Sequence, residues 1–141
     1  MDHRDLVGRL ASTFRESPVA GIVSAYVFGS HVSGRIHNDS DLDLGVLFDR
    51  RLYETSRQRF DARVVLGGYL ARTLHARDVD LVGLDDAPPT LVRTVMTRGL
   101  RVFCANVEAD QVARRTALSR AADLEPFLRR MRRIKLDAIA R

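Results

Sequence analysis

Three aspartates stand at positions where their carboxylates could act together. Asp41 and Asp43 are separated by one leucine, and Asp80 lies between a valine and a leucine in a later apolar run. On a β-strand, side chains two residues apart lie on the same face, so Asp41 and Asp43 would point the same way with β-carbons about 7 Å apart. Mg²⁺ prefers hard oxygen ligands and takes one or two carboxylates together with phosphate oxygens and water. The pair therefore predicts a Mg²⁺ site that binds a phosphorylated substrate.

The third aspartate extends this site if its strand neighbours the strand of the first two. Asp80 would then face the same cleft, where it could bind a second metal ion or accept the proton of an attacking hydroxyl. Asp78 lies on the same face by parity but nearer the start of its strand, so we rank it below Asp80. The alternative interpretation is a solvent-facing strand edge whose charges deter aggregation.

A turn rich in glycine and serine precedes the aspartates. Gly29 and Ser30 follow an apolar run, and glycine there lets backbone N–H groups approach phosphate oxygens while the serine hydroxyl adds a donor. Gly34 would supply a second turn, and Ser40 could orient Asp41 or bond a phosphate. The glycines are also compatible with ordinary turn chemistry.

Alternating strands and helices must position these residues. The patterns predict strands over about 22–28, 41–48, 78–84 and 100–104, and helices over about 6–14, 53–75, 89–99 and 106–141. Asp85 and Asp86 before two prolines form a helix-start signal, Gly99 marks that helix's end, and Pro126 should break or kink the last helix. The alternation indicates an α/β domain with a mixed sheet flanked by helices.

Length and composition favour one domain over residues 1–141, with a core at about 20–105 and a C-terminal helical segment at about 106–141. The single cysteine, Cys104, favours a reducing, cytoplasmic setting and should be a small core residue. No apolar stretch is long enough for a membrane span. His31 and His37 carry no second ligand at metal spacing, so we expect solvated loop histidines.

The formal net charge of +5 makes anionic partners plausible, although a solvated basic surface explains it as well. No compact basic run precedes the C-terminal segment, so nucleic acid is not expected as a direct partner. The arginines of that segment could grip an acidic partner or cover a solvated helix face. They are Arg114, Arg115, Arg120, Arg129, Arg130, Arg132 and Arg133.

In order and spacing, these motifs resemble those of the DNA polymerase β-like nucleotidyltransferase superfamily, and within it the minimal nucleotidyltransferases of HEPN-MNT toxin–antitoxin modules. The resemblance runs from about Gly29 to Phe103 through GSHVSG, SDLDL, VDLV and MTRGLRVF. One departure is Ser33, where the family usually carries arginine, and Arg35 could take its place. The resemblance implies a polymerase β palm-like fold.

The same resemblance implies a reaction. Two Mg²⁺ ions held by Asp41, Asp43 and Asp80 would serve the transfer of AMP from ATP to a tyrosine on a cognate HEPN toxin. One alternative is a small-molecule nucleotidyltransferase, such as an antibiotic-modifying enzyme, although those usually carry an extra helical domain. The other is a catalytically weak antitoxin that neutralises its partner by contact alone.

Overall fold

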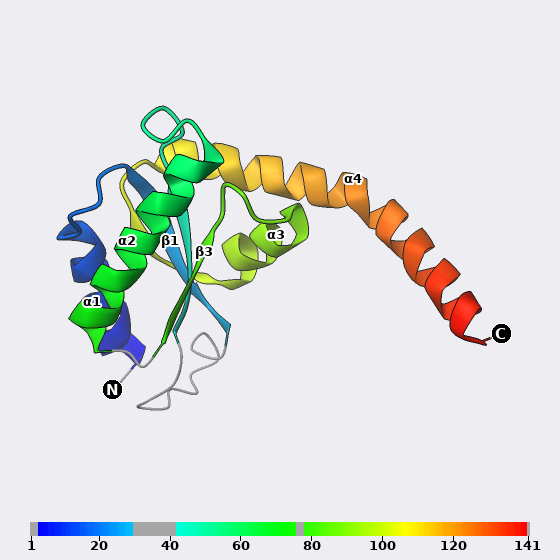
Figure 1. Cartoon of the computed structure of the whole chain (residues 1–141), viewed down its shortest axis with the longest axis horizontal. Helices are drawn as coiled ribbons and strands as arrows, with labels where there is room; N and C mark the ends of the chain where they lie inside the picture. The colour runs from blue at the N-terminus through cyan, green and yellow to red at the C-terminus, as the bar shows by residue number, and fades with distance from the viewer. Residues whose placement is uncertain (1–2, 30–41, 76–77, 141) are drawn as a thin grey trace.

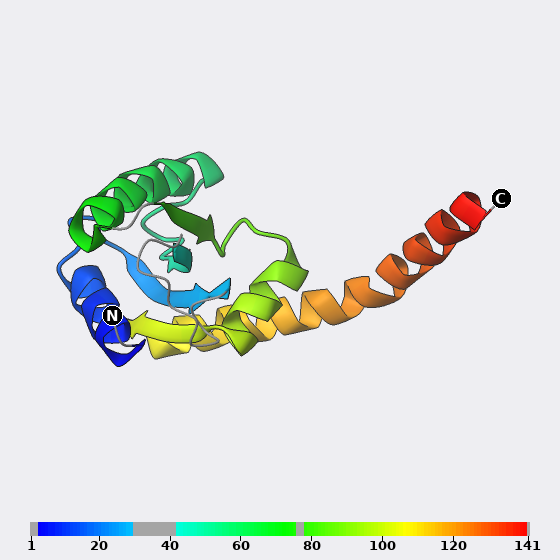
Figure 2. The same ribbon diagram turned by 90° about the horizontal axis from the view of Figure 1, so that it is seen from below.

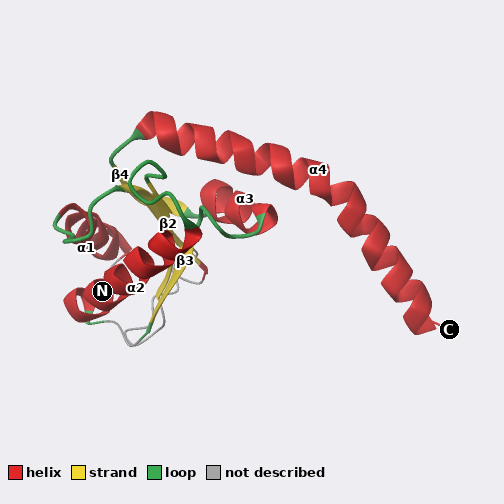
Figure 3. Ribbon diagram, turned by 45° about the horizontal axis from the view of Figure 1, so that its top comes forward, coloured by secondary structure: helices red, strands yellow, loops and turns green. Residues whose placement is uncertain are grey.

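The computed structural model describes residues 3–29, 42–75 and 78–140, which form a four-stranded sheet with helices on both faces (Figures 1 and 3). None of the helices in these ranges is long and apolar enough to cross a membrane. In chain order the elements are α1 (His3–Arg15), β1 (Ile22–Phe28), β2 (Leu42–Phe48), α2 (Ser56–Leu74), β3 (Val79–Gly83), α3 (Pro89–Arg98), β4 (Leu100–Cys104) and α4 (Val107–Ala140).

The sheet is mixed, with strand order β3-β2-β1-β4. β2 and β3 run parallel, which requires the crossover that α2 provides, whereas β1 is antiparallel to both β2 and β4. This arrangement confirms the predicted α/β class with a mixed sheet and a C-terminal helix. It also places the end of β1 and the starts of β2 and β3 at one edge of the molecule.

Each face of the sheet carries its own apolar core. Leu44 and Val46 of β2 pack with α1 and α2, whereas Leu47 packs with α3 and α4 on the other face. Gly45 also lies on the α3 face, because a Cβ there would stand only 3.0 Å from a methyl group of Val95. Asp43 shares this face by strand alternation. On the α3 side of β2, the strand therefore carries a carboxylate at its start, and its later residues are covered by α3 and α4.

The second helix differs from its expected bounds of 53–75. It begins at Ser56 because Thr55 and Gln58 form a capping box, in which each side chain bonds the other's backbone N–H. It ends at Leu74, where His75 adopts a left-handed conformation with φ of 51°. The glycines at positions 67 and 68 lie inside the helix without interrupting it.

The helix-start signal before α3 is confirmed in its proline and wrong in its carboxylates, because Pro89 lies in the first turn whereas Asp85 and Asp86 lie before the helix. α3 begins at Pro89 after Pro88, which supplies no side-chain cap. The Asp85 carboxylate instead accepts a hydrogen bond from the backbone N–H of Phe48 at 2.8 Å. Asp85 thus bonds a residue that is distant in the sequence, whereas the local pattern predicted that it would stabilise the N-terminus of the helix.

Pro126 does not end the last helix. α4 continues through it to Ala140, and Figure 3 shows the helix bending in its second half. Proline lacks an N–H and so removes one hydrogen bond of the helix, which is a recognised cause of such bends.

A buried polar cluster fastens the first turns of α4 to the sheet. The Tyr26 hydroxyl donates to a carboxylate oxygen of Asp110 at 2.6 Å, and Arg101 donates to the other oxygen at 3.1 Å. Asp110 is only 2% exposed. Burial of the hydroxyl, followed by its bond to Asp110, raises the pKa of Tyr26 well above its usual range. Tyr26 therefore remains a neutral donor, and the cluster sets where α4 leaves the body.

Replacing Asp110 with alanine should lower the free energy of unfolding by about 2 kcal/mol, because the buried Tyr26 hydroxyl loses its acceptor. Urea denaturation measures the loss. Adding Tyr26→Phe to this variant should recover part of it, since the orphaned hydroxyl is then gone. Equal stability of Asp110→Ala and wild type would contradict the anchoring role.

Candidate active site

Two of the three predicted carboxylates lie side by side at the start of neighbouring strands. Asp43 and Asp80 are register partners in the parallel β2–β3 ladder, and the Leu42 N–H donates to the Asp78 carbonyl at 2.9 Å just before them. Neighbouring strands lie about 4.8 Å apart. Both carboxylates project from the α3 face, because Leu81, next to Asp80, is buried in the opposite core. Asp43 is half-buried and Asp80 is exposed.

Gly29 closes β1 directly beside this pair. Its φ of 80° lies in the left-handed region that favours glycine. A Cβ at this position would stand 2.5 Å from the Oδ2 atom of Asp43. Phe28, the preceding residue, is the register partner of Asp43 on β1. Both the backbone conformation and the space around Gly29 therefore require glycine for the Asp43 carboxylate to lie where it does.

The carboxylate pair fits a divalent cation. Like charges at directly opposed positions of neighbouring strands are destabilising, and a cation between them removes the conflict. Carboxylate oxygens are the hard ligands that Mg²⁺ prefers. Among the residues that the structure describes, no group of three or more side chains is placed to hold a metal. Asp43 and Asp80 would supply two ligands to such a cation, and further ligands would come from elsewhere.

The remaining predicted site residues lie outside the described ranges, so their roles stay predictions. They are Ser30, Gly34, Ser40 and Asp41.

Two ion pairs that the sequence did not reveal lie at the other end of β2 and β3. Arg50 donates to Asp85 at 3.3 Å, and Arg59 grips both oxygens of Asp86 at 2.8 and 2.9 Å. Burial raises the pKa of Asp85, partly offset by the Phe48 N–H and Arg50, whereas the hydrogen bonds from Arg59 lower the pKa of Asp86. The pairs fix the β3–α3 loop to β2 and α2, and their arginines lie 27 and 35 residues away in sequence.

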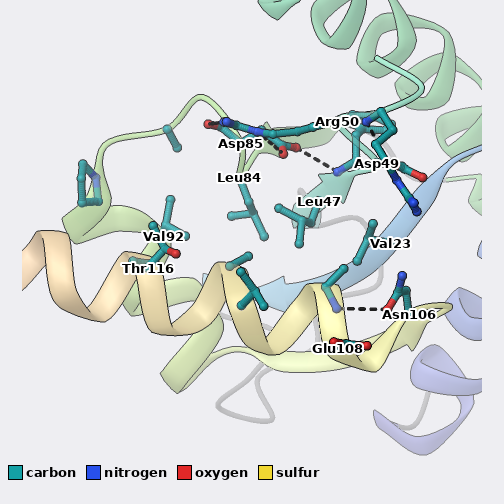
Figure 4. Close-up of a pocket in the computed structure, with 18 of the residues that line it drawn as sticks. Val23, Leu47, Asp49, Arg50, Leu84, Asp85, Val92, Asn106, Glu108 and Thr116 are labelled. Atoms are coloured by element: carbon teal, nitrogen blue, oxygen red, sulfur yellow. Dashed lines mark hydrogen bonds and ion pairs between the residues drawn. The ribbon is translucent and has the colours of Figure 1, made fainter. Parts of the chain in front are cut away.

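A cavity of about 540 Å³ opens at this same end, on the α3 face of the sheet (Figure 4). Apolar side chains of β1, β2, α3 and α4 line it, among them Val23, Leu47, Val92 and Val112. It lies near Phe48, five residues beyond Asp43 on β2, so roughly 17 Å separates it from the carboxylates. The cavity is therefore distinct from the candidate active site.

The chain matches the sequence model of one protein family and resembles several solved structures. Residues 9–108 match the sequence model described as polymerase beta, nucleotidyltransferase. A chain in the crystal structure of a toxin–antitoxin with AMP-PNP is 25% identical, with 96% of this chain and 98% of that chain covered and a TM-score of 0.65. No curated protein gives a significant match to the sequence.

Two further structures share the fold. One is the complex of a tri-AMPylated Shewanella oneidensis HEPN toxin with an MNT antitoxin, at 23% identity, 99% coverage of both chains and a TM-score of 0.60. The other is a candidate minimal nucleotidyltransferase, 29% identical, which covers 71% of this chain and 95% of its own at a TM-score of 0.51. These likenesses confirm the predicted nucleotidyltransferase fold.

Replacing Gly29 with alanine should lower the free energy of unfolding by about 1–2 kcal/mol through the left-handed backbone alone. The new methyl group would also displace the Asp43 carboxylate. Gly8→Ala is the matched control, because nothing lies within 4 Å of a Cβ at that helical position, and it should raise stability by about 0.5–1 kcal/mol. Thermal or urea denaturation of both variants measures the difference, and two equal shifts would contradict it.

Proposed function

This chain belongs to the polymerase β-type nucleotidyltransferase family, and on that premise we propose that it is an antitoxin that transfers AMP from ATP to a tyrosine of a cognate HEPN-domain toxin. The register of Asp43 with Asp80, beside the Gly29 turn, carries the proposal. The AMP-PNP and the tri-AMPylated HEPN toxin of the solved relatives support the choice of nucleotide and acceptor. Use of ATP agrees with the cytoplasmic setting expected from the single cysteine.

The metal-binding side chains in this proposal are Asp41, Asp43 and Asp80, which would hold one or two Mg²⁺ ions. Mg²⁺ bound there supplies charge neutralisation for the triphosphate and polarises the attacking hydroxyl. Asp43 is the central ligand, because its carboxylate is fixed from one side by the Gly29 turn and lies next to Asp80 on the other.

The turn after β1 would hold the phosphates. Backbone N–H groups of Gly29 and Ser30 and the Ser30 hydroxyl would donate to phosphate oxygens, with Gly34 and Ser40 completing the cradle. This assignment places the anion beside the start of β2, within reach of the carboxylate pair. It leaves the exposed Asp80 on the solvent side, where an acceptor would approach.

The chemical step is an in-line displacement at the α-phosphorus. The tyrosine oxygen forms a bond to the α-phosphorus. The bond between the α-phosphorus and the oxygen that bridges it to the β-phosphate breaks, and pyrophosphate leaves with that oxygen. The hydroxyl proton passes to the carboxylate of Asp80, which acts as the base. The product is a phosphodiester between AMP and the tyrosine.

Purified chain, cognate HEPN toxin, Mg²⁺ and ATP labelled at the α-phosphate test the proposal. We expect label on the toxin, with the rate reduced about 100-fold or more by Asp43→Asn and by Asp80→Asn. Asp61→Asn is the control, because Asp61 lies on α2 in a solvent-exposed ion pair with Arg57 and should leave the rate unchanged.

Removal of Asp80 relieves the repulsion between opposed carboxylates, so this variant should be no less stable than wild type. A loss of transfer therefore reports on chemistry and not on folding. Transfer at the wild-type rate by Asp43→Asn would overturn the proposed site. Full neutralisation of the toxin by Asp43→Asn would instead show that the antitoxin acts by contact.

A further inference from the structure

The second half of α4 extends beyond the body of the protein. The buried residues of this helix, Asp110, Ala117 and Ala121, all lie in its first part. From residue 122 to residue 140 none of the side chains is buried, and Figures 1 and 2 show this segment projecting away from the sheet in two perpendicular views. We call residues 122–140 the arm. The family match ends at residue 108, so the arm lies outside the part that defines the nucleotidyltransferase domain.

The arm carries an apolar stripe that continues the buried face of α4. Ala117 and Ala121 are followed at helical spacings of three and four by large apolar side chains, so these lie along one face. Exposed fractions in this stripe are 38% for Leu124, 52% for Phe127, 37% for Leu128, 49% for Met131 and 57% for Ile134. In proteins, most of the stability of a helix comes from packing of its amphipathic face rather than from helix propensity. The stripe therefore has the properties of an interface that lacks its partner.

The cavity described above opens onto the same side of α4. Thr116 and Arg120 line it, and Phe127 follows Arg120 by seven residues, or two helical turns. Figure 4 shows Thr116 of α4 and Val92 of α3 on the walls, with Leu47 and Leu84 in the floor. We call this cavity the groove. Groove and stripe thus adjoin along α4, with the Arg120 side chain at the junction between them.

Charge decides which kind of partner this surface fits. Lys135 lies four residues after Met131 and so falls within the stripe, where a partner must offer a carboxylate. The arm has three acidic residues, Asp123, Glu125 and Asp137, and Glu125 already bonds Arg129 at 2.9 Å. The arm also has five basic residues, so two arms would repel each other. They are Arg129, Arg130, Arg132, Arg133 and Lys135.

We propose that the groove and the arm together form the docking surface for the acceptor protein of the transfer reaction, which meets them with an apolar face flanked by carboxylates. This inference rests on the proposed function for the identity of the partner. The groove lies roughly 17 Å from Asp43 along β2, a separation that a folded protein bound at the groove readily spans. An acceptor that docks at the groove can thereby present its tyrosine to the carboxylates at the other end of the sheet.

The test compares two variants with the same chemical change on different faces of the arm. Met131→Glu places a negative charge in the stripe, whereas Leu136→Glu places one outside it, at a side chain that is 64% exposed. Both are made in an Asp43→Asn background, so that the acceptor is not modified during the measurement. Binding of the cognate HEPN toxin is followed by isothermal titration calorimetry, and circular dichroism verifies equal helix content.

We expect Met131→Glu to weaken binding by about tenfold or more and Leu136→Glu to change it by about twofold at most. Equal binding of both variants would overturn the docking surface even if wild type transfers AMP. Stripe-dependent binding without AMP transfer by wild type would overturn only the proposed reaction. Analytical ultracentrifugation of the chain alone gives the remaining outcome: a dimer that Met131→Glu dissociates would assign the stripe to a second copy and overturn acceptor docking.

Discussion

The fold holds two like charges side by side. Asp43 and Asp80 occupy registered positions on parallel strands, although aspartate is a poor strand former and opposed carboxylates repel. The placement persists because Leu44 and Leu81, the next residues along each strand, are buried on the opposite face and keep both strands in register. The α2 crossover makes the strands parallel, and Gly29 leaves room for the Asp43 carboxylate. These features maintain an acidic edge that fits a divalent cation, as the proposed function requires.

The β3–α3 loop at the opposite end of the sheet carries Asp85 and Asp86, and the first turns of α4 carry Asp110. Asp85, Asp86 and Asp110 each pair with an arginine from another element, and these pairs fix the β3–α3 loop and the first turns of α4. Their charges are therefore balanced within the chain and serve the structure. The groove and the arm begin at this end, so the proposed catalysis and the proposed docking occupy separate ends of one sheet. A protein acceptor can span that separation.

The sequence predicted what depends on local pattern and missed what depends on distant contacts. Strand alternation placed Asp43 on a face opposite Leu44, and the elements follow in the predicted order. The register of Asp43 with Asp80 required strand adjacency, which the sequence left conditional. Asp85 and Asp86 were interpreted as a helix-start signal because their arginine partners lie 35 and 27 residues away, outside any local pattern. Only the three-dimensional arrangement shows that no described part of the body covers the apolar residues of the arm.

In the proposed function, Asp43 and Asp80 form a metal-dependent nucleotide site. Isothermal titration calorimetry of AMP-PNP against wild type and Asp43→Asn, each with and without Mg²⁺, tests it most directly. We expect wild type to bind AMP-PNP only when Mg²⁺ is present, and Asp43→Asn to lose this binding. Binding of equal strength without Mg²⁺, or by Asp43→Asn, would contradict it.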